Sequence, residues 1–207
     1  MKRKERALFI EKKLNELYPN PKAPLDHKNA FTFLVAVLLS AQTTDKRVNL
    51  VTKELFKLAD NPQKMLDLGE KQVYELIKTC GLAPKKAKAI ISTSKIILEK
   101  HQGKVPDELS LLEELPGVGH KTASVVISEF FDKPAFPVDT HIHRLAQRWG
   151  LTNGKNVAQT EADLKRLFPK SKWNKLHLQI IYYGREYCKA RECYGISCKI
   201  CTTCYPN

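Results

Sequence analysis

The sequence has no long apolar segment. Its longest apolar run, FTFLVAVLLSA at residues 31–41, is shorter than the roughly 18 residues that a membrane-spanning helix needs. The N-terminal segment MKRKERALFIEKKLNELYP mixes charges among its apolar residues, which is typical of an amphipathic helix and not of a signal peptide. We therefore expect a cytoplasmic protein with reduced thiols and no membrane partner.

Acidic residues are few compared with basic ones. The chain has 22 Asp and Glu against 35 Lys and Arg, a formal net charge of +13. This excess favours a polyanionic partner, first nucleic acid and second an anionic membrane, although a merely soluble basic protein would show it too. A protein of the membrane surface would need a long basic amphipathic helix with an aromatic face, and none is found.

Signals for β-strands are rare, whereas apolar residues recur at spacings of three and four throughout the chain. This periodicity predicts an all-α fold. The composition changes after Pro134, which suggests a central helical domain at 22–134 and a second domain made of 1–21 plus 135–207. The expected helices cover an N-terminal segment, 31–41, a segment through Val48, Val51 and Leu55 that follows the N-cap types at 43–45, 63–68, 70–79, a basic segment after Pro84, 107–115, 120–131, 139–149, 157–168 and 171–187.

Cysteine is nearly absent before residue 188, where Cys80 alone occurs and is expected in the core. Five cysteines then fall in the last twenty residues, and in a reducing compartment such a group indicates a metal site. Cys198, Cys201 and Cys204 have the C-x2-C-x2-C spacing of bacterial ferredoxin ligands, and Cys188 completes a set of four. This favours a [4Fe–4S] cluster, with a four-cysteine zinc site as the competing interpretation.

Two glycines stand in LPGVGHKTA at residues 115–123. Gly117 and Gly119 allow a sharp turn between two short helices and a close approach of another surface. The amides of Gly117, Val118, Gly119 and His120 would then suit a phosphate oxygen. From the glycines alone, an ordinary turn between helices is the commoner interpretation.

The wider motifs decide between these interpretations. LLSAQTTD (38–45), GLAPKKA (81–87), LPGVGHKTA (115–123), VDTHIHRL (138–145) and the cysteine tail closely resemble the endonuclease III group of helix-hairpin-helix DNA glycosylases. The resemblance covers nearly the whole chain. It implies two helical domains with a helix-hairpin-helix motif, a C-terminal iron–sulfur loop and an active-site cleft between the domains.

The same resemblance implies a bifunctional enzyme of base excision repair. Such an enzyme removes oxidised pyrimidines as a DNA N-glycosylase and nicks 3′ to the abasic site by β-elimination as a lyase. The implied partner is double-stranded DNA containing damaged bases or abasic sites. We expect a monomer that associates with the bacterial nucleoid through DNA.

Lys121 and Asp139 are the residues expected to carry out the chemistry. Lys121 lies in the first turn of a helix, where a cation is disfavoured because the helix dipole is positive there, and a neutral amine can form a Schiff base with a sugar carbon. By resemblance, Lys121 attacks C1′ of the damaged nucleotide. Asp139 has the position of a helix N-cap, and by resemblance it assists the loss of the base, either by deprotonating Lys121 or by stabilising positive charge on the sugar.

Other residues are expected to contact DNA. By resemblance, Gln42 fills the gap left by a flipped nucleotide, Leu82 wedges the opposite strand, and His141 lies near the substrate. From sequence alone, Gln42 is also an ordinary exposed residue, Leu82 an ordinary turn residue, and His141 a structural histidine. The basic residues expected to face phosphates are Lys85, Lys86 and Lys88 on one helix, and Lys189 and Arg191 in the cysteine loop.

The cysteine tail departs from the spacing that the family usually shows, C-x6-C-x2-C-x5-C. Cys188, Cys198 and Cys204 fit the first, third and fourth positions, whereas Gly195 holds the second. Cys201 is preferred as the missing ligand because the ferredoxin-like triplet is a known local geometry. Cys193 is its rival.

Two alternatives stay open at this point. One is the adenine-mismatch glycosylase relative, although that group generally lacks the lysine and carries a further C-terminal domain for which 207 residues leave no room. The other is a non-catalytic iron–sulfur DNA-binding protein, which the pairing of Lys121 with Asp139 argues against.

Overall fold

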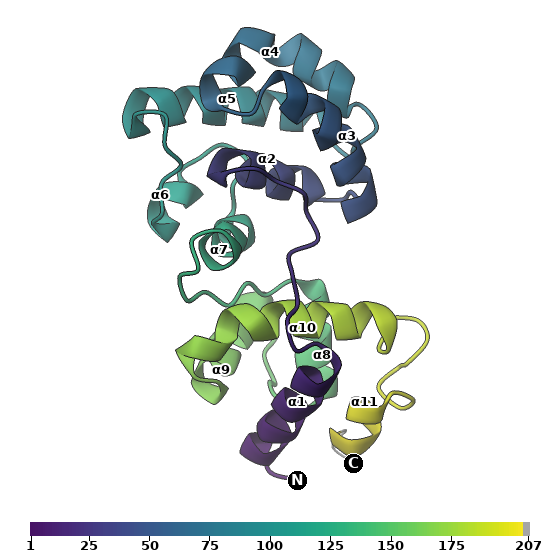
Figure 1. Ribbon diagram of the computed structural model, residues 1–207. Helices are drawn as coiled ribbons and strands as arrows, with labels where there is room; N and C mark the ends of the chain where they lie inside the picture. The colour runs from purple at the N-terminus through teal and green to yellow at the C-terminus, as the bar shows by residue number, and fades with distance from the viewer. Residues whose placement is uncertain (205–207) are drawn as a thin grey trace. The chain divides into compact units, whose positions relative to one another are not determined.

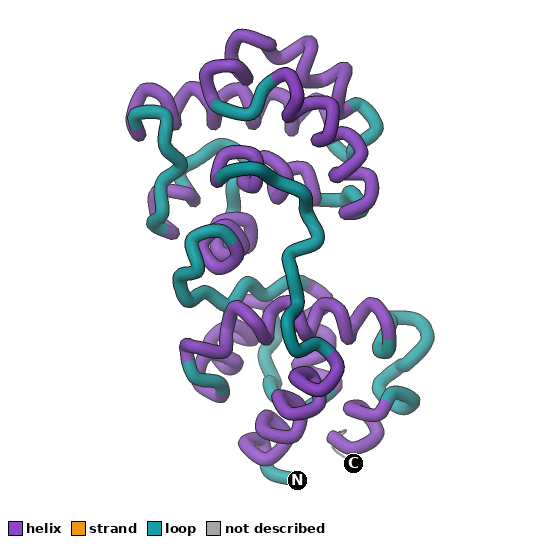
Figure 2. The backbone as a smooth tube through the Cα atoms, viewed as in Figure 1, coloured by secondary structure: helices purple, strands orange, loops and turns teal. Residues whose placement is uncertain are grey.

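The computed structural model describes residues 1–204, and these form helices and loops without any β-strand (Figures 1 and 2). The predicted all-α class is therefore confirmed. Within the described residues, no helix combines the length and apolar character required to cross a membrane. The chain separates into two compact units, Pro24–Phe131 and Met1–Ala23 joined with the chain from Asp132 onward. The domain division predicted at residues 22 and 134 stays a prediction, because contacts within a unit do not test independent folding.

The unit Pro24–Phe131 is built around its first helix. Residues 31–39 of this helix are all buried, and the helix packs against α3, α5 and α7 (Figure 1). Asn29 caps its start by accepting a hydrogen bond from the amide of Thr32 at 2.9 Å. The helices are α2 (Ala30–Ser40), α3 (Asp45–Leu58), α4 (Pro62–Ile77), α5 (Ala83–His101), α6 (Leu109–Glu113) and α7 (His120–Glu129).

Helix α4 has a kink at Gly69, which has φ 78° and ψ 159°. The two short helices predicted at 63–68 and 70–79 are the two halves of α4 on either side of this glycine. The helix predicted at 107–115 is shorter than expected, since α6 ends at Glu113. The chain then turns through Pro116 into the glycine hairpin.

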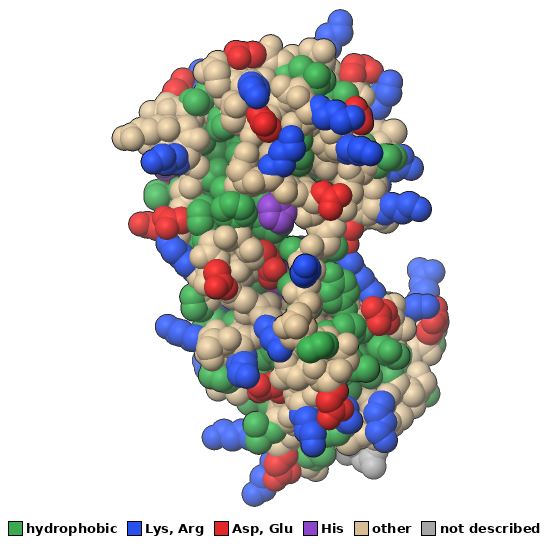
Figure 3. Space-filling view, viewed as in Figure 1, with side chains coloured by type: hydrophobic (Ala, Val, Ile, Leu, Met, Phe, Trp, Pro, Cys, Tyr) green, Lys and Arg blue, Asp and Glu red, His purple; other side chains and the backbone are tan. Residues whose placement is uncertain are grey.

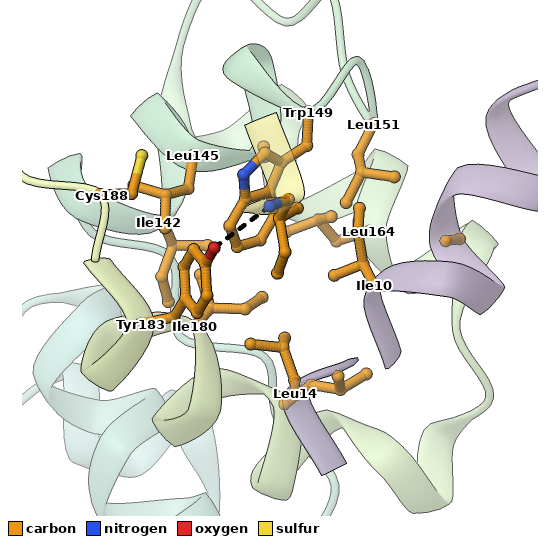
Figure 4. Close-up of a cluster of buried hydrophobic side chains, with 14 of the residues drawn as sticks. Ile10, Leu14, Ile142, Leu145, Trp149, Leu151, Leu164, Ile180, Tyr183 and Cys188 are labelled. Atoms are coloured by element: carbon orange, nitrogen blue, oxygen red, sulfur yellow. Dashed lines mark hydrogen bonds between the residues drawn. The ribbon is translucent and has the colours of Figure 1, made fainter. Parts of the chain in front are cut away.

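The second unit combines the N-terminal helix with the C-terminal third of the chain. Helix α10 packs against α1 and α8, and α11 packs against α1. Trp149 and Tyr183 are fully buried at its centre, with their rings edge to face and their centroids 5.7 Å apart (Figure 4). The helices are α1 (Arg3–Leu17), α8 (Thr140–Arg148), α9 (Val157–Leu167), the 3₁₀ turn η1 (Lys170–Lys172), α10 (Trp173–Glu186) and α11 (Lys199–Cys204).

The basic side chains are distributed over the surface of both units. On the face drawn in Figure 3, lysine and arginine side chains project from each unit, with acidic side chains between them. Several of the acidic groups pair with lysines three residues away on the same helix, such as Lys57 with Glu54 and Lys13 with Glu16. The net charge of +13 is therefore not confined to one helix.

Candidate functional site

The glycine hairpin joins α6 to α7. The amide of Val118 was expected to be available to a phosphate, but it donates to the carbonyl of Leu115 at 3.0 Å and closes the turn. Leu115 and Val118 are buried, whereas Gly117 and Gly119 are exposed. Gly117 has φ +79°, a backbone conformation that residues with a side chain rarely adopt. The predicted sharp turn is therefore present, anchored by two apolar side chains.

The hairpin rests on helices α2 and α5. A Cβ at Gly117 would lie 3.0 Å from Cβ of Ala89 and 3.4 Å from Cδ1 of Leu38. The hydroxyl of Thr93 donates to the carbonyl of Pro116 at 3.0 Å. Gly117 is thus required both for the backbone angle and for the close packing, and the hairpin has a fixed position on α5.

The start of α7 has the features of an anion site. Gly119 is its N-cap and supplies no side-chain cap, so the first amides of the helix have no partner from that position. A Cβ at Gly119 would meet no atom within 4 Å, which leaves room for an approaching group. His120 is exposed, and its Nδ1 lies 2.6 Å from a carboxylate oxygen of Glu113. Lys121 is exposed on the first turn.

Gln42 and Leu82 lie in two neighbouring turns. Both are exposed, and Leu82 retains 47% of its surface. Both have positive φ, 53° for Gln42 and 60° for Leu82, which is uncommon for residues other than glycine. The amide of Gly81, directly before Leu82, donates to the hydroxyl of Thr43, directly after Gln42, at 3.0 Å.

Lys86 was expected among the phosphate-facing lysines, and this prediction is wrong. Its side chain is buried, with 5% exposed, and its ammonium donates to the carbonyls of Leu39 and Ala41. Burial lowers the pKa of Lys86 from its ordinary value. Lys85 and Lys88 are exposed as expected. Lys86 instead binds the C-terminal end of α2, where helix carbonyls lack partners.

Asp139 is the N-cap of α8. Its Oδ1 accepts a hydrogen bond from the amide of Ile142 at 2.8 Å, and the residue is partly exposed. Since the cap uses one carboxylate oxygen, the second oxygen can still interact with a ligand. The cap position predicted from the sequence is confirmed, while the catalytic role stays a prediction.

The two nearby histidines differ in their surroundings. His141 is exposed, and its Nδ1 lies 3.4 Å from a guanidinium nitrogen of Arg144. His143 is partly buried, and its Nδ1 lies 2.8 Å from the hydroxyl of Thr160 on α9. His143 therefore links α8 to α9, whereas the side chain of His141 is accessible to a ligand.

Four cysteines converge after α10. The sulfurs of Cys188, Cys193, Cys198 and Cys201 lie within 4.8 Å of one another, and all four side chains are buried. Cys204 is buried too but is not part of this group. The group differs from both predicted sets, since each of them contains Cys204. Cys193 and Cys201, which were expected to be rivals, lie in it together.

The four thiols strongly perturb one another. Hydrogen bonds with Cys188 and Cys201 hold the pKa of Cys198 far below its ordinary value. Hydrogen bonds with Cys188 and Cys198 raise the pKa of Cys201 far above it. A buried group of this kind does not accommodate four thiolates without a compensating positive charge. This donor set therefore suits a metal ion or an iron–sulfur cluster, whose thiolate ligands bind as anions.

Arginines of α8 fix the loop that carries the cysteines. Arg148 donates to the sulfur of Cys188 at 3.3 Å and to the carbonyls of Lys189 and Ala190 at 3.2 and 3.0 Å. Arg144 donates to the carbonyl of Cys188 at 3.0 Å. Lys189 and Arg191, the two basic residues of this loop that were expected to contact DNA, are both exposed. Lys189 pairs with Glu192 at 3.0 Å.

Sequence reasoning missed three of these contributors, namely Lys86, Thr43 and Arg148. A signal existed for Lys86, because it stands four residues before Ile90 and three after Ala83, which are both buried, and this spacing places it on the buried side of a helix. No local signal existed for Thr43 or Arg148, since their partners lie 38 and 40 residues away in the chain.

Comparisons with known proteins agree with this geometry. The family described as "HhH-GPD superfamily base excision DNA repair protein" matches residues 35–170, more than half of the chain. The endonuclease III of Escherichia coli strain K12 is 43% identical over 201 residues, covering 97% of this chain and 95% of that protein. The endonuclease III of Rickettsia conorii is 45% identical over 183 residues, covering 88% and 86%.

Solved structures show the same relationship. An endonuclease III in a non-covalent complex with DNA has a TM-score of 0.93 at 35% identity, covering 99% of this chain and 96% of the other. An endonuclease III captured as a trapped covalent intermediate with DNA has a TM-score of 0.91 at 35% identity, covering 97% and 94%. The chain therefore belongs to the endonuclease III group of the HhH-GPD superfamily and is a base excision repair DNA glycosylase and lyase.

Proposed function

We propose that this glycosylase and lyase acts on oxidised pyrimidines in double-stranded DNA through Lys121 as the nucleophile. The observation that carries the proposal is the exposed Lys121 on the first turn of α7, directly after the hairpin amides. The relative trapped as a covalent intermediate with DNA supports it, because an amine nucleophile forms a covalent intermediate with its substrate. The lesion class is an inference from the resemblance.

The hairpin would hold the DNA by its backbone. Amides at the start of a helix bind phosphate oxygens and carry no base preference, so this contact positions the strand without reading its sequence. The open space beside Gly119 lets a phosphate reach these amides. Since Lys121 follows two residues later, the sugar adjacent to the bound phosphate would come within reach of its amine.

The reaction starts with the neutral amine of Lys121. The amine forms a bond to C1′, while the glycosidic bond breaks and the base leaves with that electron pair and takes up a proton. The sugar ring then opens to leave an imine between C1′ and Lys121. Removal of a proton from C2′ expels the 3′-phosphate, and water finally hydrolyses the imine to regenerate the amine.

Asp139 would assist the loss of the base. Its carboxylate is held by the cap hydrogen bond to Ile142, so its orientation does not depend on the substrate. It can accept a proton from Lys121 or stabilise the positive charge that develops on the sugar. Both roles require a charged carboxylate, and both are compatible with the cap.

Access to the sugar requires the damaged nucleotide to leave the duplex, which costs a few kcal/mol. We assign Gln42 to the space that the nucleotide vacates and Leu82 to the opposite strand. Their exposure and their left-handed backbone conformations support this assignment, because strained exposed residues often serve ligand contacts. His141, Lys85, Lys189 and Arg191 are accessible for further contacts with DNA.

Borohydride trapping tests the nucleophile. We would incubate the protein with a duplex containing thymine glycol, add sodium borohydride, and measure the reduced protein–DNA adduct. The wild type should form the adduct, and Lys121→Gln should not, although its DNA binding persists. Lys95→Gln is the matched control, because Lys95 is an exposed lysine on α5 with 65% of its side chain accessible. An adduct formed by Lys121→Gln would refute the assignment.

A second substrate identifies the lesion class. A wild-type adduct with an abasic duplex but none with thymine glycol would keep the lyase and reject oxidised pyrimidine as the substrate. Absence of an adduct with either duplex would reject the Schiff-base mechanism altogether.

We also propose that the cysteine group holds a [4Fe–4S] cluster, with zinc as the competing occupant. Cys188, Cys198 and Cys201 belong to the group and to the preferred predicted set, so the fourth ligand is Cys193 or Cys204. Proximity supports Cys193, while the ferredoxin-like spacing supports Cys204. When bound, the cluster supplies metal–thiolate bonds that brace the segment after α10.

Serine variants distinguish between Cys193 and Cys204 as the fourth ligand. If Cys193 is a ligand, Cys193→Ser should lose the brown absorbance and most of the iron, whereas Cys204→Ser should keep both. The reverse pattern assigns Cys204. Cys80→Ser is the matched control, since Cys80 is another buried thiol, in the unit Pro24–Phe131. Purified protein that contains zinc in place of iron would reject the [4Fe–4S] proposal.

A further inference from the structure

Lys86 is a buried cation that the proposed chemistry does not use. Its ammonium lies 2.8 Å from the carbonyl of Leu39, 2.5 Å from that of Ala41 and 3.1 Å from the hydroxyl of Thr43. An ammonium has three protons to donate, so these acceptors satisfy it completely. Burying a cation without such partners is costly, which explains why all three contacts are present.

The partners of Lys86 all lie at the end of α2 and in the turn that follows. Leu39 belongs to the last turn of α2, and Ala41 is its C-cap. Their carbonyls have no helical partners and lie at the negative end of the helix dipole. The ammonium of Lys86 therefore binds residues on both sides of Gln42, and fixes the backbone position from which the Gln42 side chain extends into solvent.

Lys86 also belongs to the segment that carries Leu82. It is four residues after Leu82, and its amide donates to the carbonyl of Leu82 at 3.0 Å. Thr43 accepts hydrogen bonds from both Lys86 and the amide of Gly81. A Cβ at Gly81 would lie only 2.6 Å from the carbonyl oxygen of Gln42. The two turns are thus in direct contact, and one network joins them.

We infer that Lys86 is a positioning residue that holds the Gln42 and Leu82 turns in register for insertion into the duplex. The inference rests on the proposed roles of Gln42 and Leu82. Both residues have left-handed backbone conformations, which surrounding contacts must maintain. Without the ammonium, the two carbonyls and Thr43 lose a shared donor, and the turns lose the link that sets their separation.

The test compares two substrates that differ only in the work of opening the duplex. One is a fully paired duplex containing thymine glycol, and the other has the same lesion strand in an unpaired bubble. Flipping costs least for a base that is already unpaired. For Lys86→Met, we expect kcat/KM on the paired duplex to fall about tenfold, as is common within one hydrogen-bonded network, and kcat/KM on the bubble to change by less than about twofold.

Three further variants accompany Lys86→Met. Lys95→Met removes an exposed lysine from the same helix and should leave both substrates unaffected. Thr43→Val removes the shared acceptor, and should reproduce the selective loss even if Lys86→Met does not fold. Thr43→Ser keeps the hydroxyl and should restore activity on the paired duplex. Fluorescence of 2-aminopurine beside the lesion should show reduced unstacking in Thr43→Val but not in Thr43→Ser.

The outcomes separate this inference from the proposed function. Equal losses on the two substrates would show that the network only stabilises the fold, and unchanged values for both Lys86→Met and Thr43→Val would reject any role. Gln42→Ala and Leu82→Ala should themselves lower kcat/KM on the paired duplex but not on the bubble. If they do so while Lys86→Met and Thr43→Val do not, the proposed function stands and the inference fails. If none of these four variants lowers kcat/KM on the paired duplex, the proposed roles of Gln42 and Leu82 fail, and the inference that rests on them fails too.

Discussion

At the scale of single residues, two functional candidates combine a structural role with a chemical one. Asp139 caps α8 through Ile142, and Gly117 provides both a left-handed turn and close packing on Ala89. A substitution that removes both roles cannot distinguish them. An informative variant keeps the structural contact and changes only the chemistry.

Asp139→Asn is such a variant. The asparagine carbonyl oxygen can accept the same hydrogen bond from the amide of Ile142, and asparagine is as good an N-cap as aspartate. We therefore expect the melting temperature to stay within a few degrees of the wild type. Base release should fall by about a hundredfold or more, because general acid–base assistance typically contributes factors of this size. Single-turnover release of thymine glycol measures this rate.

Asp139→Ala provides the comparison. It loses the cap as well and should lower the free energy of unfolding by about 1 kcal/mol. If Asp139→Asn retained the wild-type rate of base release, the carboxylate would be a cap and nothing more.

The sequence identifies candidate residues where a motif carries them, and it does not identify residues whose position depends on a distant partner. Lys121 and the exposed Gln42 and Leu82 were all found from motifs, and their exposure agrees with what those motifs imply. Lys86 was assigned to the surface, because a lysine among lysines usually lies in solvent. The spacing of Lys86 from the buried Ala83 and Ile90 indicates that it is buried, whereas local sequence does not identify its partners, which are carbonyls at the end of α2 more than 40 residues away.

At the scale of elements, one side of α5 organises the surface assigned to DNA. Leu82, Lys86, Ala89 and Thr93 follow one another at spacings of four, three and four, so they share one face of the helix. Lys86, and Gly81 directly before Leu82, contact the turn that contains Gln42, and Ala89 and Thr93 contact the hairpin. The three exposed segments are therefore fixed to a single rigid helix.

The two hairpin glycines should respond differently to alanine. Gly117→Ala places a side chain at φ +79° and within 3.0 Å of Ala89, and the left-handed conformation alone costs about 1–2 kcal/mol. Gly119→Ala meets no atom within 4 Å and has an ordinary φ of −90°. It should therefore keep the wild-type stability but obstruct an approaching phosphate and weaken DNA binding about tenfold or more, as the loss of one charge-assisted contact does.

Thermal unfolding and fluorescence anisotropy with an abasic duplex measure the two properties. Wild-type affinity in a folded Gly119→Ala protein would show that no phosphate approaches this amide. Wild-type stability in Gly117→Ala would mean that the hairpin can move away from α5.

Helix α8 has a corresponding organising role in the other unit. Asp139 lies at its N-terminus, while Arg144 and Arg148 hold the backbone around Cys188. Their positions follow helical spacing and could be predicted. Their contact with the cysteine loop could not, because it depends on how α10 returns that loop to α8.

At the scale of the whole molecule, the helical class and most helix positions follow from apolar periodicity, because most helices bury one side in their own unit. The almost fully buried α2 follows instead from its continuous apolar run. The cysteine loop does not follow in this way. Its four-sulfur group contains Cys193 and omits Cys204, and helix α11 has too few residues for a periodic signal. Packing in three dimensions, and not spacing along the chain, determines this region.

Removal of the proposed cluster should destabilise the unit that contains the cysteine group. The five tail cysteines are part of the same buried core as Trp149 and Tyr183, and Figure 4 shows Cys188 in this core. Four thiols held there without a compensating cation repel one another when ionised. We expect chelator-treated protein to lose protection from amide hydrogen exchange in α8, α10 and α11, while α2 and α5 keep theirs. Uniform protection before and after iron removal would show that the cluster does not brace this unit.

The net charge of +13 should make DNA binding strongly dependent on salt. Each phosphate neutralised by a lysine or arginine releases counterions, so about six such contacts would weaken binding about a thousandfold between about 50 and 200 mM salt. The Lys121→Gln variant, which is expected to bind DNA, allows this salt dependence to be measured without turnover.

Lys85→Gln should reduce the slope of log K against log salt by about one, because it removes a charged contact. Gly119→Ala should weaken binding with an unchanged slope, because the amides of the hairpin carry no net charge. Equal slopes for Lys85→Gln and the parent would remove Lys85 from the DNA contacts, and a flat salt response would contradict the electrostatic basis of binding altogether.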